Sequence, residues 1–303
     1  MDRSLGAAIK EGYFPLECNP AMLYAVTMTL SSRNIVFKTG IGVSLLALAF
    51  TLVASFSVFS VYPQVGADAQ RAAGFFQALV APFFQPAAYV AFVTTISSVL
   101  YAFITMFLIY YFFEKTQSPE ILFFALFVVS LAFESLRIMV PFRVVKDLPS
   151  VVLVISARVL IFGRYYGLFS LFVASVYAAG LDQQKQGNVV FIIAVATLTI
   201  ALGVPIDGLS WDSSMLVIFG FATMFKTVEI GIVLITMLSF FISAYTRGAK
   251  EYVFIGIGSV LVSLGRTVLL SADTWVTPLP GLILLIGGTW IICSQLHRVY
   301  LWL

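Results

Sequence analysis

Charged residues are scarce in this chain: only 10% of its 303 residues are Asp, Glu, Lys or Arg, whereas 61% are hydrophobic. A soluble domain carries roughly 25% charged residues, and the mean hydropathy here is +1.04. Apolar stretches of ~20 residues recur along the chain, and such stretches are typical of membrane-spanning helices. The sequence therefore predicts a polytopic membrane protein and excludes a soluble fold.

Residues that ligate metals or carry nucleophilic chemistry are equally scarce. The chain has one histidine, His297, and two cysteines, Cys18 and Cys293. Zinc and haem sites usually need more donors of this kind, and the two cysteines form neither a CxxC pattern nor a disulfide framework. The sequence contains no HExxH, GxSxG or P-loop motif. We therefore expect no metal, no cofactor and no enzymatic activity. The net charge of +3, without a Lys/Arg-rich block, also argues against a nucleic-acid partner.

Eight apolar segments are candidates for membrane spans, so the predicted fold class is an all-α transmembrane helix bundle. The segments run over about Phe37–Tyr62, Ala88–Phe113, Ile121–Pro141, Ser150–Ala179, Val189–Val204, Met215–Tyr245, Tyr252–Leu270 and Leu279–Leu296. The fifth is short, and without it the count would be seven. We expect a single transmembrane domain over residues 37–303, preceded by a cytoplasmic segment over residues 1–36. Residues 66–86 suggest either a short interfacial helix or a packed loop.

The distribution of basic residues predicts that both termini are cytoplasmic. Lys and Arg gather before the first span and in the loops after the second, fourth, sixth and eighth, at Arg33, Lys38, Lys115, Lys185, Arg247, Lys250 and Arg298. The opposite loops carry mostly aspartates, and the main exception is the pair Arg143 and Lys146. No cleavable signal peptide is recognisable, so we expect the first span to act as an uncleaved insertion signal.

Seven charged residues fall inside the apolar segments: Glu134, Arg137, Arg158, Arg164, Lys226, Glu229 and Arg266. A charge in hydrocarbon is costly, so such residues normally face the interior of a bundle and pair with one another. Counting ~1.5 Å per helical residue places most of them in one layer, between the membrane centre and the non-cytoplasmic face. The set holds five cations and two anions.

Three interpretations of this charge layer stay open. The charges could form a purely structural network that ties helices together. They could instead bind an anionic ligand or a lipid headgroup, which would offset the surplus of cations. In the third interpretation some of them, Arg137 first, lie at the membrane interface.

One stretch resembles a known family. After Phe107 the chain reads LIYYFFEKTQSPEILFFALFVVSLAFESLR, ending at Arg137. An aromatic helix end, a short charged turn over Glu114–Glu120 and a following Phe- and Leu-rich helix resemble the membrane domain of bacterial seven-transmembrane receptors with diverse intracellular signalling modules. Residues Val176–Asp207 are similar in style. The resemblance implies a receptor-like protein of the bacterial cytoplasmic (inner) membrane. The sensor and output domains typical of that family are not recognisable, so a partner protein would have to supply the output.

The sequence thus supports three functions. The first is a receptor-like or accessory signalling protein of the membrane. The second is a small-solute transporter with a cationic site near the midplane, although Pro and Gly seldom interrupt the middle of the spans. The third is a structural subunit of a larger membrane complex. The expected partners are the lipid bilayer, an anionic ligand or lipid headgroup, and an output protein.

Overall fold

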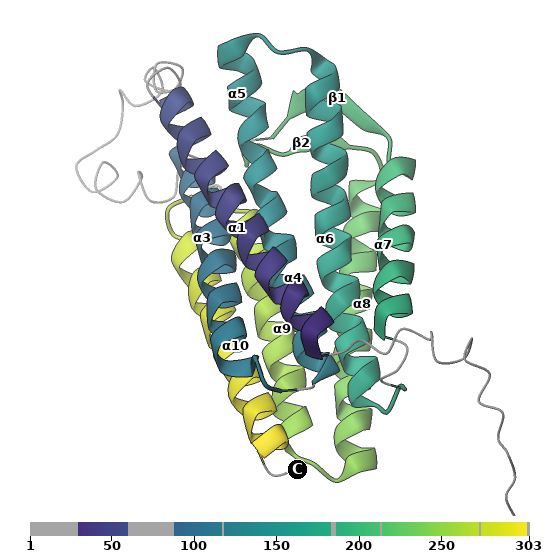
Figure 1. Ribbon diagram of the computed structural model, residues 1–303. Helices are drawn as coiled ribbons and strands as arrows, with labels where there is room; N and C mark the ends of the chain where they lie inside the picture. The colour runs from purple at the N-terminus through teal and green to yellow at the C-terminus, as the bar shows by residue number, and fades with distance from the viewer. Residues whose placement is uncertain are drawn as a thin grey trace, which may run out of the picture.

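The computed structural model describes residues 30–59, 88–116, 118–182, 186–212, 214–272 and 274–301. They form a bundle of long helices with a two-stranded β-hairpin at one end (Figure 1). The elements in chain order are α1 (Leu30–Phe59), α3 (Ala88–Phe113), α4 (Pro119–Ala132), the 3₁₀ helix η4 (Phe133–Ile138), α5 (Met139–Lys146), α6 (Ser150–Ala178), α7 (Gln186–Gly203), β1 (Ile206–Trp211), β2 (Val217–Phe219), α8 (Ala222–Arg247), α9 (Glu251–Leu270) and α10 (Pro278–Leu301).

Within the part of the chain that the structure describes, eight helical segments are long and apolar enough to cross a membrane, which confirms the predicted polytopic helical protein. The fifth predicted span is among them, as Gln186–Gly203. The third span is composite, because α4, η4 and α5 follow one another without a break from Pro119 to Lys146. Residues 1–29 and the candidate interfacial helix at 66–86 lie outside the described residues.

The two ends of the bundle differ in the elements that they contain. The terminal end, toward the bottom of Figure 1, holds the start of α1 at Leu30, in the lower half of the view, and the end of α10 at Leu301 below it. The hairpin end, at the top, holds β1, β2 and the end of α5. The fold does not show which end faces the cytoplasm, so the cytoplasmic termini remain a prediction.

Several predicted boundaries were wrong, among them the start of the first span, which is Ser32 rather than Phe37, and two of the differences bear on the site. The third span continues past Pro141 to Lys146. Proline is tolerated there because it falls in the first turn of α5, where backbone N–H groups have few helical partners. Its ring still crowds the carbonyl four residues earlier, that of Arg137, and the preceding turn is the tighter 3₁₀ helix η4.

The sixth span begins at Ala222 rather than Met215, because residues 206–219 form an antiparallel hairpin instead of helix. The Asp212 carboxylate closes the turn by accepting hydrogen bonds from Ser214 Oγ and the Leu216 N–H, both at 2.8 Å. The sequence placed Asp212 between spans, in agreement with this turn, but it read Val217–Phe219 as part of an apolar helix because that strand is short and hydrophobic.

The third span is the centre of the bundle. In its most apolar 18-residue stretch, 83% of the residues are buried, against 17% for α7. The third span packs on α6, α3 and α1, whereas α7 lies at the periphery and packs mainly against α6 (Figure 1). Charge carried by the third span is therefore shielded from lipid by several neighbouring helices.

Candidate functional site: a buried charge network at the hairpin end

The centre of the site is a bidentate ion pair between the third and fourth spans. Arg164 Nε donates to Glu134 Oε1 at 2.8 Å, and Arg164 Nη2 donates to Glu134 Oε2 at 2.9 Å. The side chain of Glu134 is 2% exposed and that of Arg164 is 14% exposed. Two parallel charge-assisted hydrogen bonds fix both distance and orientation, so this pair sets how η4 and α6 lie against each other.

Small residues on α6 allow this close approach. A Cβ on Gly163 would lie 2.8 Å from atoms of Phe133, and a Cβ on Gly167 would lie 2.1 Å from Ser130 Oγ. Phe133 immediately precedes Glu134, and Gly163 immediately precedes Arg164. The glycine contact thus brings the two backbones together where the charges must meet.

Arg137 connects the same span to the hairpin end. In a 3₁₀ helix residues i and i+3 lie on one face, so Arg137 lies over Glu134 on η4. Its guanidinium donates to the carbonyl oxygen of Ser214, in the hairpin turn, and to that of Leu270 at 3.1 Å. Leu270 is the last residue of α9, where carbonyls lack helical partners. Arg137 is therefore covered by protein, at the level where α9 ends.

Arg266 and Glu229 extend the network to α9 and α8. Arg266 is 5% exposed and interacts electrostatically with Glu229 and Glu134. Glu229 also interacts with Arg164 and with the buried Tyr165. Three arginines thus face two glutamates, a surplus of one cation, and Asp212 at the exposed rim of the hairpin also interacts with Arg164. The surplus of cations is smaller than the sequence suggested.

Two of the seven predicted residues lie apart from this cluster. Lys226 is exposed on α8, one turn from the start of that helix. Arg158 is half-buried on α6, and its Nε has no hydrogen-bond partner among the described residues. The later start of α8 moves Lys226 from the expected mid-membrane depth to the hairpin end, where a long basic side chain reaches the membrane surface.

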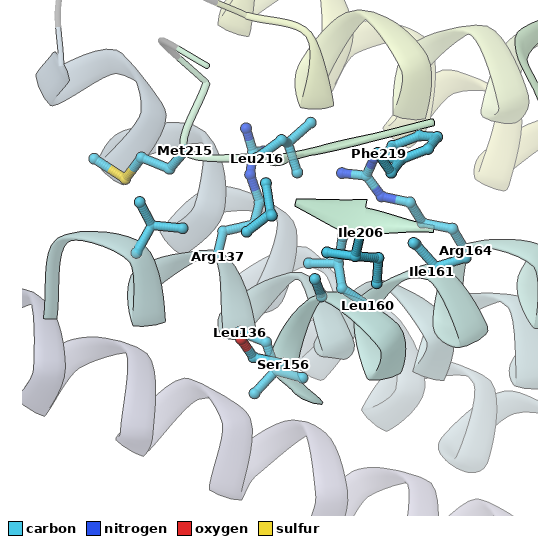
Figure 2. Close-up of a pocket in the computed structure, with 13 residues that line it drawn as sticks. Leu136, Arg137, Ser156, Leu160, Ile161, Arg164, Ile206, Met215, Leu216 and Phe219 are labelled. Carbon is cyan, nitrogen blue, oxygen red and sulfur yellow. The ribbon is translucent and has the colours of Figure 1, made fainter. Parts of the chain in front are cut away.

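A small cavity adjoins the ion pair. Figure 2 shows Arg137 and Arg164 pointing toward the hairpin, with Leu216 and Phe219 above them and Ser156 on the opposite side. The remaining lining is mostly aliphatic, and the space of about 20 Å³ is close to that of one water molecule. In this conformation the cavity suits a water molecule rather than an organic anion.

A second polar cluster, not predicted from the sequence, lies at the terminal end. Glu120, only 2% exposed, accepts hydrogen bonds from Ser118 Oγ at 2.8 Å and from the Tyr300 hydroxyl at 2.7 Å. Arg247 donates to the Tyr252 hydroxyl at 3.0 Å and to the carbonyl oxygen of Tyr177 at 3.3 Å. The signal for Glu120 was available: Ser118-Pro119-Glu120 is a helix start with an N-cap serine, which makes Glu120 part of a helix rather than of a turn.

Comparisons with known proteins identify no function. An uncharacterized protein of Treponema pallidum is 29% identical over 89 residues, which cover 29% of this chain and 26% of that protein. The match thus spans only about a quarter of that relative's length. No family model matches the chain, and no solved structure matches it.

Proposed function

We propose that this protein is a receptor-like or accessory signalling protein of the bacterial inner membrane, with both termini cytoplasmic. In this proposal the charge network holds the third span in one of two positions, and a partner protein reads the difference at the terminal end. The resemblance of Phe107–Arg137 to bacterial seven-transmembrane receptors supports the same assignment. The ligand or event that releases the network would be anionic, because three arginines face two glutamates in the buried part of the cluster and Asp212 lies at its exposed rim.

The observation that carries this proposal is the placement of the Glu134–Arg164 ion pair on the 3₁₀ segment of the most buried span. A mid-helix 3₁₀ stretch often marks a hinge, and a packed span with two discrete arrangements can couple distant ends. The third span reaches from Glu120, in the cluster at the terminal end, to Arg137, which binds the hairpin. It is therefore the element that connects both polar clusters.

A transporter is less well supported by the geometry. Carriers of small solutes bind their substrate near the membrane centre, whereas the space beside Arg137 and Arg164 accommodates about one water molecule. A structural subunit is favoured by a different observation, the peripheral position of α7 against α6. Light scattering of the detergent-solubilised protein would test that alternative, since a stable assembly of several chains would favour it.

Double electron–electron resonance tests the proposed coupling in reconstituted protein. Spin labels would be attached to cysteines replacing Lys115, before the third span, and Leu181, after the fourth, with the native cysteines removed. Glu134→Gln should shift or broaden the distance distribution between these labels, although Glu134 lies near the middle of the third span, away from both labelled positions. Lys226→Gln, which removes an exposed charge near the same end, is the matched control.

A purely structural network predicts a different result. Glu134→Gln would then lower stability while the distribution between the two labels stays that of the unmodified protein. That outcome, or an equal response to Lys226→Gln, would overturn the proposed coupling.

A further inference from the structure

A groove at the terminal end lies between the last turns of α8 and the first turns of α9. It measures about 390 Å³ and is lined by Phe241, Ala244, Tyr245, Gly248, Lys250 and Val253. The two helices are joined there by a turn of three residues, and Gly248 takes the left-handed conformation, φ 64° and ψ 16°, that ends α8. In Figure 1 this turn lies at the bottom, close to the C-terminus.

The groove crosses the level at which two membrane spans end. The sixth span finishes at Arg247 and the seventh begins at Glu251. Lys250 therefore lies at the membrane surface, while Phe241 lies between one and two turns deeper on α8 and Val253 less than one turn deeper on α9. A molecule that fills the groove must have a polar part at the surface and an apolar part beneath it.

The deeper wall is apolar and is held in place by close packing of the helices. A Cβ on Gly256 of α9 would lie 3.1 Å from Phe240 Cβ and 3.6 Å from Phe241 Cε1, so α8 and α9 converge just above the groove. Ala244 and Val253, nearer the turn, belong to the apolar lining and pack with the hydrophobic core. Tyr245 is 90% exposed beside them, the position of an aromatic residue at a membrane–water interface.

The mouth of the groove carries positive charge. Lys250 is exposed and forms no ion pair among the described residues. The guanidinium of Arg247 is directed instead toward Tyr252, whose ring centroid lies 5.3 Å away, and toward the carbonyl of Tyr177. Arg247 thus adds to the positive field, whereas Lys250 is available to contact a ligand directly. Glu251 supplies one opposing charge, so the turn remains cationic.

We propose that this groove binds one molecule of an anionic phospholipid. The phosphate lies at Lys250, the Tyr245 hydroxyl meets the polar region below it, and the first part of an acyl chain packs on Phe241, Ala244 and Val253. A basic residue near an anionic lipid surface typically contributes ~1 kcal/mol, which corresponds to about a fivefold change in affinity. This proposal does not depend on the signalling function or on the charge network at the hairpin end.

Native mass spectrometry of the full-length protein in detergent tests the proposal. The protein would be titrated with dioleoyl phosphatidylglycerol and, separately, with dioleoyl phosphatidylcholine. The wild-type chain should retain a first phosphatidylglycerol molecule more tightly than phosphatidylcholine. Lys250→Gln should weaken the first phosphatidylglycerol by about fivefold, and Lys250→Glu by more, because the charge is reversed.

Lys115→Gln is the matched control, because Lys115 is an exposed lysine in another turn at the same end. It should leave the first phosphatidylglycerol bound as in the wild type. Equal retention of the two lipids by the wild type would mean non-specific lipid only and would overturn the proposal. Equal losses with Lys250→Gln and Lys115→Gln would do the same, as would displacement of the lipid by inorganic phosphate at constant ionic strength.

Discussion

At the scale of single residues, Glu134 is the charged group of the network whose burial depends most on its neighbours. It is a buried carboxylate surrounded by Arg137, Arg164 and Arg266, and it forms two short hydrogen bonds with one of them. A buried ion pair contributes little net stability over an apolar pair, but removing one partner leaves the other charge buried and uncompensated. The network is therefore far more sensitive to single substitutions than to paired ones.

We expect Arg164→Gln to lower the free energy of unfolding by about 3–5 kcal/mol, because it leaves the Glu134 carboxylate without its bidentate partner. Glu134→Gln should have a similar effect, and the double variant should lose much less than the sum. Unfolding in mixed micelles with increasing dodecyl sulfate measures all three. Additive losses would show that the two side chains do not act as a pair.

The exposed control for this cycle is Lys226→Gln, with an expected change within about 0.5 kcal/mol. Arg247, which the sequence places in a loop, is unsuitable as a control. Although exposed, it donates to Tyr252 and to the carbonyl of Tyr177 and lies over the Tyr252 ring.

At the scale of elements, α9 and α10 form the closest helix pair of the described bundle. Glycines spaced by seven residues occur on both helices, at Gly258 and Gly265 and at Gly281 and Gly288. Each lies against backbone of the opposite helix, as where a Cβ on Gly265 would be 2.6 Å from Leu285 N. In lipid, the association of two helices depends on such close backbone packing. An apolar side chain gains little by leaving the acyl chains for another helix, because both environments are apolar.

Two adjacent glycines of α10 provide a matched test. A Cβ on Gly288 would lie 2.6 Å from Val262 Cγ2 and 2.8 Å from the carbonyl oxygen of Gly258, whereas one on Gly287 meets nothing within 4 Å. Gly288→Ala should destabilise the fold by about 1–3 kcal/mol through overpacking. Gly287→Ala should be neutral or slightly stabilising, because alanine favours the helix by about 0.5–1 kcal/mol. Thermal unfolding in detergent measures the stability of both variants. Equal melting temperatures would contradict the close packing of α9 and α10 at Gly288.

At the scale of the whole molecule, polar clusters lie at both ends of the bundle and the third span connects them. At the hairpin end Arg137 ties η4 to the hairpin and to the end of α9. At the terminal end the Tyr300 hydroxyl ties α10 to Glu120 at the start of α4. Between them the span is packed against α6 and α3, so the proposed coupling between the two ends would run through this buried element.

The predicted orientation is testable in intact cells with a membrane-impermeant maleimide, after removal of Cys18 and Cys293. A cysteine replacing Val276, which is 42% exposed at the hairpin end, should react from outside. A cysteine replacing Lys115, at the terminal end, should react only after the membrane is permeabilised, because loops rich in Lys and Arg stay cytoplasmic. The reverse pattern would show that the termini lie outside.

Composition and pattern were sufficient for the membrane class, the number of spans and most of their boundaries. Long apolar runs leave the backbone no alternative to helix in lipid, since each N–H and C=O must be satisfied within the segment. The same logic singled out seven charged residues, because isolated charges in such runs normally face the protein interior. Five of them lie in the cluster, and Arg158 and Lys226 lie apart from it.

Tertiary structure decided what hydropathy cannot distinguish. Residues 206–219 form a hairpin rather than helix, because the Asp212 side chain closes a turn that pairs two short strands. Pro141 tightens the preceding turn and so aligns Glu134 with Arg137. Which charges pair, and why Lys226 stays outside the cluster, depends on where each helix begins and which face it turns inward. The start and the inward face of each helix are set by contacts between segments that are distant in the sequence, and hydropathy does not reveal those contacts.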